Sequence, residues 1–334
     1  MFGCPRDWLA FSLAAFAGCE PSPSGDAPLV AGVHPPPARA HGAAIPPAGA
    51  EAASAALAPA LETLRSHYPD GKPRLERQVK RDADGVINHG PYRRWHFNGQ
   101  LAEAGEYVDG LKHGTYTLYD ESGLRASQID YERGRKHGPA IEWNDLGHKL
   151  RESAWREDRL HGPFREWFEG TEERSLEGHY EDGLEVGPWV RWITPGVKGE
   201  EGEYVAGLRE GKWTFWHATG AIRAEAEFRG GRWHGRVVEH DEQGRRVAER
   251  SYKDGAADGL QVELYPGGSI KSEVEYELGR PNGRTTYWYE EGSKQLEGRM
   301  RDGLREGRWT VWNNDGTVNE AWSGTYAAGQ RVPD

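Results

Sequence analysis

Five histidines stand directly before a glycine, in a pattern that recurs along the chain: His89, His113, His137, His161 and His234. Imidazole nitrogens are common zinc ligands. The first four histidines are 24 residues apart, and an interval that holds two paired strands would separate neighbours by about 10 Å. A zinc ion binds nitrogen at about 2.1 Å, so these side chains cannot share one ion. We expect them to be turn residues and expect no metal site.

Carboxylates also recur, four residues after the same glycine: Glu142, Glu166, Glu239 and Glu263. Such carboxylates could pair for glycoside hydrolysis, but they recur in the manner of surface residues and no pair is singled out. The chain has no Gly-rich phosphate loop, no nucleophile elbow and no His-Glu-x-x-His motif. We therefore expect neither enzymatic activity nor a cofactor.

An aromatic residue follows the recurring glycine at a distance of five residues in most copies. The members of this aromatic row are Trp95, Tyr119, Trp143, Trp167, Trp192, Trp216, Trp288 and Trp312. A row of rings on an accessible face could stack on sugars or grip an apolar partner. Each ring could also simply supply the cross-strand contacts that a thin sheet needs. We treat the row as the candidate binding face and keep both interpretations open.

The recurring glycine defines a repeat, and we call it the marker glycine. Its copies are Gly90, Gly114, Gly138, Gly162, Gly187, Gly211, Gly235, Gly259, Gly283 and Gly307. All intervals are 24 residues except the fourth, which is 25. A fixed period of this size indicates a repeat array. A half-copy precedes the first, around Tyr68 and Gly71, and the last copy has two extra residues, as terminal repeats often do.

Each repeat contains two short apolar and aromatic runs bounded by Asn-Gly, Asp-Gly or similar pairs. Such pairs favour tight hairpin turns, and the runs have the composition of strands. We predict an all-β protein, an elongated single-layer antiparallel β-meander of about ten β-hairpin repeats. Roughly twenty strands at about 4.8 Å would extend on the order of 100 Å.

One feature of the repeat leaves two alternatives. Aromatics stand both two and five residues after the marker glycine, as in Trp213 and Trp216. Side chains at an odd separation on a regular strand face opposite sides of the sheet. Either both faces carry aromatics, or a β-bulge brings the two rows onto one face.

The Gly-x-Tyr/Trp-x-x-Trp…Asn-Gly…Tyr-x-x-Gly…His-Gly pattern resembles the MORN (membrane occupation and recognition nexus) repeat. It is most similar to the bacterial MORN-variant group of YwqK-like antitoxin proteins. The resemblance covers about residues 67 to 330 and implies a hairpin array used for binding or scaffolding, without chemistry of its own. Copies seven and eight depart from the pattern, with His240 and Leu264 in place of the tryptophan and Asp258 in place of the histidine.

The N-terminal residues have a different composition. An apolar run at residues 8–18 has the length of a secretory signal core and is too short to span a bilayer. The sequence Ala17-Gly18-Cys19 resembles the lipobox of bacterial lipoproteins, in which the cysteine is lipidated. We predict a signal peptide at 1–19, a Pro/Ala-rich linker at 20–66 with a short capping helix over Glu51 to Ser66, and the array at 67–334.

The net charge of −11 disfavours nucleic acid as a partner, because binding phosphates needs a basic face. The charge suits a basic protein partner, and it also simply keeps an exposed sheet soluble. The end strands of an open sheet invite end-to-end self-association. The only cysteines are Cys4 and Cys19, so the array has no disulfide.

These patterns together predict a non-catalytic binding scaffold that is anchored in the cell envelope through lipid at Cys19 and presents an aromatic-lined sheet to a protein partner. Contact with a membrane is expected only through that anchor, and a cytoplasmic location follows if the N-terminal segment is not a signal. An antitoxin that neutralises a toxin is one alternative, which the resemblance suggests. Binding of an envelope glycan is the other.

Overall fold

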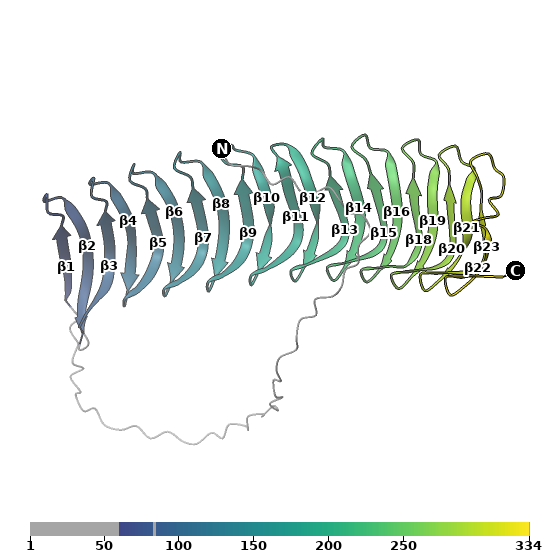
Figure 1. Ribbon diagram of the computed structural model, residues 1–334. Coiled ribbons are helices and arrows are strands. Elements are labelled where there is room, and N and C mark those ends of the chain that lie inside the picture. The colour runs from purple at the N-terminus through teal and green to yellow at the C-terminus, as the bar shows by residue number, and fades with distance from the viewer. Residues whose placement is uncertain (1–59, 83–84, 334) are drawn as a thin grey trace, which may run out of the picture. The chain divides into compact units, whose positions relative to one another are not determined.

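The computed structural model describes residues 60–82 and 85–333. In these residues the chain forms 24 β-strands and no helix, and consecutive strands pair antiparallel except β17 and β18, which both pair with β16 (Figure 1). This arrangement confirms the predicted single-layer β-meander. The signal peptide, Cys19 and most of the linker lie outside the described residues.

Two sets of strands alternate along the array, and we call them the rising and falling strands after their direction in Figure 1. The rising strands are β1 (Leu61–His67), β3 (Gly85–Trp95), β5 (Leu111–Tyr119), β7 (Arg135–Trp143), β9 (Arg159–Trp167), β11 (Leu184–Thr194), β13 (Leu208–Trp216), β15 (Arg232–His240), β17 (Ala256–Ala257), β18 (Gly259–Leu264), β20 (Arg280–Trp288), β22 (Leu304–Val311) and β24 (Gln330–Val332). The falling strands are β2 (Pro73–Asp82), β4 (Leu101–Val108), β6 (Arg125–Glu132), β8 (Lys149–Arg156), β10 (Arg174–Glu181), β12 (Val197–Val205), β14 (Ile222–Arg229), β16 (Arg246–Lys253), β19 (Ile270–Glu277), β21 (Lys294–Arg301) and β23 (Gly324–Ala327).

Two kinds of turn join these strands and form the two long edges of the array. The wide turns lie along the top of Figure 1; in one of them Asp120 accepts the backbone N–H groups of Ser122 and Leu124, both at 2.9 Å. The tight turns lie along the bottom and have two residues, such as Arg133 (φ 49°) and Gly134 (φ 81°). Two successive positive φ angles are the geometry of a type I′ hairpin turn.

Hydrogen bonds between consecutive repeats hold both edges together. At the tight turns the glycine N–H donates to a carbonyl one repeat earlier, as from Gly134 to Lys112 at 2.8 Å. At the wide turns a side chain bonds the carbonyl of the next copy's aromatic-row residue. Two examples are His96 Nε2 with the Tyr119 carbonyl, at 2.9 Å, and the Tyr265 hydroxyl with the Trp288 carbonyl, at 2.8 Å.

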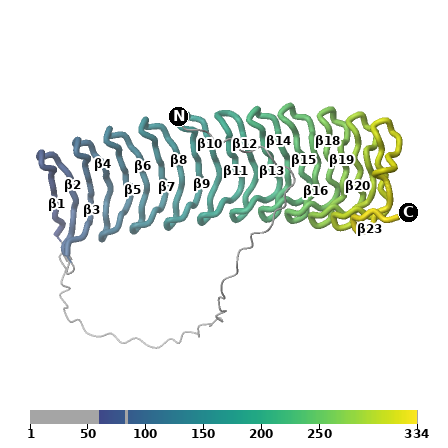
Figure 2. The backbone as a smooth tube through the Cα atoms, viewed as in Figure 1, coloured from purple at the N-terminus to yellow at the C-terminus, as the bar shows by residue number. Residues whose placement is uncertain are grey.

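A β-bulge at each marker glycine shapes the rising strands. In the β4–β5 pair Ala104 faces Thr117 but Glu106 faces His113, so β5 contributes two more residues than β4 across this interval. Gly114 stands in this bulge with a φ of 67°, which a residue with a side chain rarely adopts. Bulged strands bend, and Figure 2 shows the rungs of the ribbon following the same curved path along the array.

The structure settles the alternative between one and two aromatic faces. On β5 the pairing with β6 runs residue by residue from Tyr116 to Leu118, and the extra residue opposite the step from Leu118 to Tyr119 lies on the falling strand β6 instead. The aromatics two and five residues after the marker glycine therefore face opposite sides of the sheet. We call the side with the residue at position 2 the core face, and the side with the aromatic row the row face.

The core face buries most of the side chains that hold the array together. The residue at position 2 is buried in every copy from the second onward: Tyr116, Ala140, Phe164, Trp189, Trp213, Val237, Gln261, Thr285 and Trp309. Aromatics at position 17 stand between them. The Trp213 ring lies 5.0 Å from Tyr204 and 6.1 Å from Phe228, both edge to face. Such pairs contribute roughly 0.5–1.5 kcal/mol beyond the burial of their area.

The residue at position 2 is matched in size to the residue at position 15 of the preceding copy, except in copy eight, where Gln261 follows Arg250. Where position 15 is glycine, a large ring lies flat on the backbone, as Tyr116 does on Gly105 and Trp213 on Gly202. A Cβ on Gly202 would lie 2.3 Å from the Trp213 ring. Where position 15 is larger, its partner is smaller. These directly paired residues are Ile129 with Ala140, Ala226 with Val237, and Val274 with Thr285.

The structure corrects the prediction at the C-terminal end of the linker. Residues 61–66 belong to β1 and not to a capping helix, and the array begins at Leu61 instead of residue 67. The cause is pairing with β2, which is supported by cross-strand ion pairs from Glu62 to Arg81 and from Arg65 to Glu76. In copy eight the rising strand is interrupted at Asp258, between β17 and β18.

We expect Gly202→Ile to destabilise the protein by roughly 3 kcal/mol, because the new side chain would overlap the Trp213 ring. Adding Trp213→Ala reproduces the Ile129–Ala140 combination found elsewhere in the chain. The double variant should therefore lose less than the sum of the two single variants, with a coupling of about 1 kcal/mol or more. Urea unfolding followed by circular dichroism measures these differences.

Gly267→Ile is the matched control, because Gly267 lies in a wide turn with no atom within 4 Å of its Cβ position and no positive φ. It should leave the unfolding midpoint almost unchanged. Equal midpoints for Gly202→Ile and the unchanged protein would contradict the packing rule.

Candidate binding surface

The aromatic row predicted from the sequence lies on the row face, beside the wide turns. Seven members end a rising strand or follow its last residue, Trp192 lies two residues before the end of β11, and all eight are half-buried. The row is therefore partly a packing element and partly accessible, so it combines the two interpretations that the sequence left open. It is interrupted in copies seven and eight, where His240 and Leu264 replace the aromatic ring.

Basic side chains from the preceding repeat lie against the rings of the row. The charged groups of Arg125, Lys149, Lys198 and Lys294 lie 5.3, 5.6, 5.5 and 5.9 Å from the ring centroids of Trp143, Trp167, Trp216 and Trp312, respectively. Cation–π contacts at exposed sites contribute about 0.5–1 kcal/mol each. The row face therefore presents rings and cations in alternation.

A carboxylate three residues further along the falling strand pairs with many of these bases. Lys198 contacts Glu201 and Lys294 contacts Glu297, each at 2.5 Å, and Lys149 contacts Glu152. The row face thus carries bands of rings, cations and carboxylates that run along the array. These bases and acids were not predicted from the sequence, although the recurring Lys-x-x-Glu spacing on the falling strands could have revealed them.

The core face is polar beside the wide turns. Glu103 accepts hydrogen bonds from the Tyr116 hydroxyl at 2.6 Å and from Arg94 at 2.8 Å. Burial acts to raise the pKa of Glu103, but these two donors outweigh it and the pKa is lower than usual. Burial and the neighbouring Glu103 raise the pKa of Tyr116. The pair therefore stays as carboxylate and phenol at neutral pH and holds the first repeats together.

The recurring histidines lie on the rising strands, directly before the bulge at each marker glycine, and not in a turn as predicted from the sequence. His89 Nδ1 lies 3.0 Å from a carboxylate oxygen of Asp109 in the turn, and His234 Nδ1 lies 3.1 Å from Asp254. Among residues 60–82 and 85–333, no three His, Cys, Asp or Glu side chains come together as a metal site would require. The histidines are therefore strand residues, and the side chains of His89 and His234 contact an acid of a tight turn.

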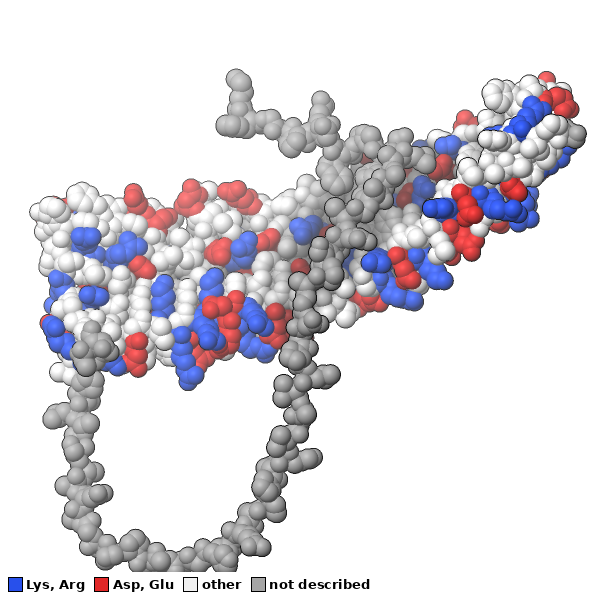
Figure 3. All heavy atoms as spheres, turned by 60° about the horizontal axis from the view of Figure 1, so that its bottom comes forward, with Lys and Arg blue, Asp and Glu red and all other residues white. Residues whose placement is uncertain are grey.

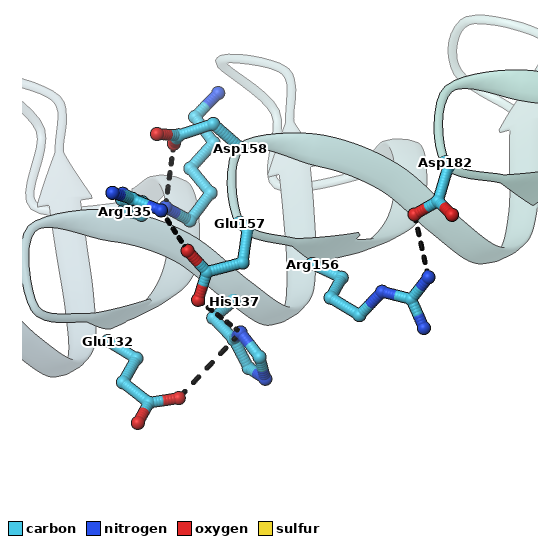
Figure 4. Close-up of polar contacts among 8 residues, drawn as sticks. Glu132, Arg135, His137, Arg156, Glu157, Asp158 and Asp182 are labelled. Atoms are coloured by element: carbon cyan, nitrogen blue, oxygen red, sulfur yellow. Dashed lines mark hydrogen bonds and ion pairs between the residues drawn. The ribbon is translucent and has the colours of Figure 1, made fainter. Parts of the chain in front are cut away.

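Ion pairs at the tight turns connect one repeat to the next (Figure 4). Arg135 contacts Glu157 of the following turn, and His137 lies 3.8 Å from Glu157 and 3.7 Å from Glu132. One repeat further, Arg156 contacts Asp182 at 2.6 Å. Figure 3 turns this edge forward and shows acidic and basic side chains interspersed along it, without a broad field of one sign.

Comparison with protein families matches two segments of the chain, residues 88–109 and 209–229, to the MORN repeat variant. Each segment begins two residues before a marker glycine, Gly90 or Gly211, so the two matches occupy the same place in their repeats. This repeat type is that of a binding scaffold. No curated protein matches the chain.

The solved structures that are similar to this chain have very low TM-scores. A TcdB2-TccC3-Cdc42 structure is 11% identical with a TM-score of 0.16, and the match covers 77% of this chain but only 16% of that one. A protein of unknown function from Bacteroides fragilis is 6% identical with a TM-score of 0.09, over 66% of this chain and 95% of that one. In the described part of this chain no helix is long and apolar enough to cross a membrane.

The contact between Arg156 and Asp182 yields a titration prediction. The Arg156 hydrogen bond is the main cause of a lowered pKa of Asp182, so the stability that this carboxylate contributes is present above its ordinary pKa and is lost as the pH falls through the lowered value. Arg156→Ala should raise the pKa of Asp182, as measured by carboxyl NMR titration. The pKa of Asp120 is lowered mainly by a hydrogen bond from the Ser122 hydroxyl, so it should not change in this variant. An unchanged Asp182 titration would contradict the ion pair.

Proposed function

We propose that this MORN-repeat chain is a non-catalytic scaffold that presents its row face to a protein partner and is exported and held in the cell envelope by a lipid on Cys19. The observation that carries the binding role is the row of half-buried aromatic rings with cations between them, repeated along one face of the sheet.

The composition of the row face suits a protein surface. Tryptophan, tyrosine and arginine are the residues that contribute most to protein–protein binding energy, and they are enriched near the centre of interfaces. The cations of the row face are already held by ring and carboxylate contacts, for example Lys198 between Trp216 and Glu201. Side chains held in place before binding lose less entropy when a partner docks.

The rows also favour an extended contact over a small-molecule site. Repeats lie about 10 Å apart, so one partner of ordinary size would touch several copies of the same ring, cation and carboxylate. The five consecutive copies from Trp95 to Trp192 have an unbroken aromatic row, which continues to Trp216. The copies without a ring, around His240 and Leu264, separate this long segment from the shorter one at Trp288 and Trp312.

The proposed location rests on the N-terminal sequence. A short apolar run ends at Ala17-Gly18-Cys19, and a segment rich in Pro, Ala, Gly and Ser follows. A chain of that composition serves as a tether between an anchor and a folded domain. Such a tether would leave the array free to meet a partner in the envelope.

The full chain is expected to retain a protein from an extract of its own cells. Replacing Trp143, Trp167 and Trp192 together by Ala should reduce the retained amount by roughly tenfold or more, because several aromatic contacts of about 1–2 kcal/mol each are removed. Affinity capture followed by mass spectrometry measures the difference, after circular dichroism has shown that the sheet persists.

Leu118→Ala with Arg191→Ala is the control, because both side chains are exposed and lie on the core face. The control variant should retain the partner. Retention of envelope glycan instead of protein, or equal retention by the row variant, would contradict the proposed protein-binding face.

Lipidation is tested separately in cells fed labelled palmitate. The chain should incorporate the label, and Cys19→Ala should lose it and appear in the soluble fraction, because the thiol of Cys19 is the proposed acceptor. Cys4→Ala serves as the control and should remain labelled. Label that persists in the Cys19 variant would remove the anchor from the proposal while leaving the binding face untouched.

A further inference from the structure

One tight turn in the middle of the array differs from its neighbours in composition. It joins β12 to β13 and reads Val205-Ala206-Gly207-Leu208. Every other tight turn between β4 and β22 carries at least one charged residue, either in the turn or at the two strand ends beside it. The centre of the tight-turn edge therefore lacks the charges that the adjacent turns present.

The side chains around this turn form an exposed apolar patch. Val205 and Leu208 pair across the turn and are 58% and 51% exposed. Leu184, which begins β11, is 49% exposed, and its Cδ2 lies 3.4 Å from the position that a Cβ on Gly207 would take. We call Leu184, Val205, Ala206 and Leu208 the edge patch. Exposed apolar side chains that cluster are typical of interaction sites, whereas single ones are common on any surface.

The backbone of the turn does not require an apolar residue at Ala206. Its φ is 50°, in the left-handed region, which aspartate tolerates better than alanine does. Four other tight turns have an aspartate at this place with φ angles of 50–51°: Asp109, Asp182, Asp254 and Asp302. An exposed alanine here gives up that preference and keeps the edge patch free of charge.

Opposite charges stand on the two sides of the edge patch. The last residue of the falling strand is Glu181 in the preceding repeat, Val205 at the patch and Arg229 in the following repeat. The acid and the base are thus each one repeat, or about 10 Å, from the centre. Arg232 pairs with Arg229 across the next turn and adds a second base on that side. All three charged residues are exposed.

These three charges have no internal partner in the part of the chain that the structure describes. No ion pair or side-chain hydrogen bond there involves Glu181, Arg229 or Arg232. The adjacent edge differs, since Arg156 and Asp182 contact each other at 2.6 Å (Figure 4). The charges beside the edge patch are therefore available to a group outside the chain.

A second copy of the chain offers the complement to this pattern. A two-fold axis through the turn at Ala206 reverses the direction of the array, so the residue one repeat before the axis meets the residue one repeat after it. Glu181 of each copy would then lie against Arg229 of the other, and the two edge patches would cover each other at the axis. A parallel arrangement would instead bring like charges together, which is unfavourable.

The next repeats outward do not oppose this arrangement. The last residue of the falling strand there is Arg156 on one side and Lys253 on the other, and these two bases would face each other across the axis. Arg156 is already neutralised by Asp182, and Lys253 is followed directly by Asp254. Exposed charges compensated in this way add little to an interface in either direction.

We propose that two copies of this chain associate antiparallel along their tight-turn edges, centred on the edge patch, with Glu181 of each copy against Arg229 of the other. The inference goes beyond the proposed function, because the aromatic row lies beside the wide turns at the opposite edge. The dimer would therefore present two accessible row faces. A contact over three repeats is smaller than that of an obligate dimer, so we expect a dissociation constant in the micromolar range.

Sedimentation velocity of the full chain, in a non-ionic detergent that keeps an anchored chain in solution, measures the association. The unchanged chain should shift from monomer to dimer as its concentration is raised. Glu181→Arg and Arg229→Glu should each weaken the dimer by roughly tenfold or more, because either change turns both attractive contacts into repulsive ones. Both residues are exposed and unpaired, so circular dichroism should show an unchanged sheet.

An equal mixture of these two variants tests the antiparallel geometry. In a mixed dimer both contacts again join opposite charges, so the mixture should dimerise about as tightly as the unchanged chain. The chain that carries both substitutions should regain its dimer for the same reason. Failure of the mixture and of the double variant to recover would overturn the proposed pairing.

Ala206→Asp tests the apolar contact separately. The turn should fold, because four other copies have aspartate at this place, and the dimer should weaken by roughly tenfold or more, because two carboxylates would lie beside the axis. Ala328→Asp is the matched control, since Ala328 is exposed and has the same place in the last tight turn, with a φ of 47°. It should leave the dimer unchanged.

Two further outcomes would overturn the proposal. Equal dimerisation by the Ala206 variant and the unchanged chain would show that the edge patch is not at the contact. A monomer at every concentration up to about 0.3 mM would assign the patch to the N-terminal segment or to another protein. Either result would leave the proposed row-face function standing, because the affinity capture tests the opposite edge of the array.

Discussion

A single layer of strands has no opposing layer in which to bury its side chains, and the structure of the array follows from this constraint. The large side chains of the core face are buried by lying flat on the backbone of the preceding strand, as Trp213 does on Gly202. The ring at position 17 of the adjacent strand then closes the gap between consecutive copies, as Phe228 does beside Trp213. Each repeat is therefore completed by its neighbour, which is the basis of stability in linear arrays.

The same constraint explains why the two long edges matter. Each hairpin is thin and would fray at its turns if only the strand ladder joined it to the next one. The glycine N–H groups of the tight turns and the side chains of the wide turns both reach into the adjacent repeat, as Gly134 and His96 show. Exposed ion pairs such as that of Arg156 and Asp182 add to the tight-turn edge, but each of them contributes little on its own.

The architecture was predictable from the sequence because its signals are local and repeated. The regular spacing of the marker glycines predicted the repeat array, and the Asn-Gly and Asp-Gly pairs predicted the hairpin turns. The choice between one and two aromatic faces was not predictable, since it depends on which strand of a pair carries the extra residue, and only pairing across strands reveals that. β1 was assigned to a helix because its pairing with β2 is likewise not a local signal. The eight rings of the row were found by their spacing, while the cations against them belong to another repeat and are distant in the chain.

The pairing of position 15 with position 2 of the next copy limits how such a gene can change length. Arrays of near-identical units commonly gain or lose copies through unequal recombination, which preserves the reading frame here because the unit is a whole number of codons. Removing residues 115–138 would bring Gly105 against Ala140 and leave a void, while removing residues 139–162 would bring Ile129 against Phe164 and crowd them. Repeats that share the same glycine pattern are therefore not interchangeable, because each one is matched in side-chain size to its particular neighbour. The order of the copies must be kept for the array to pack.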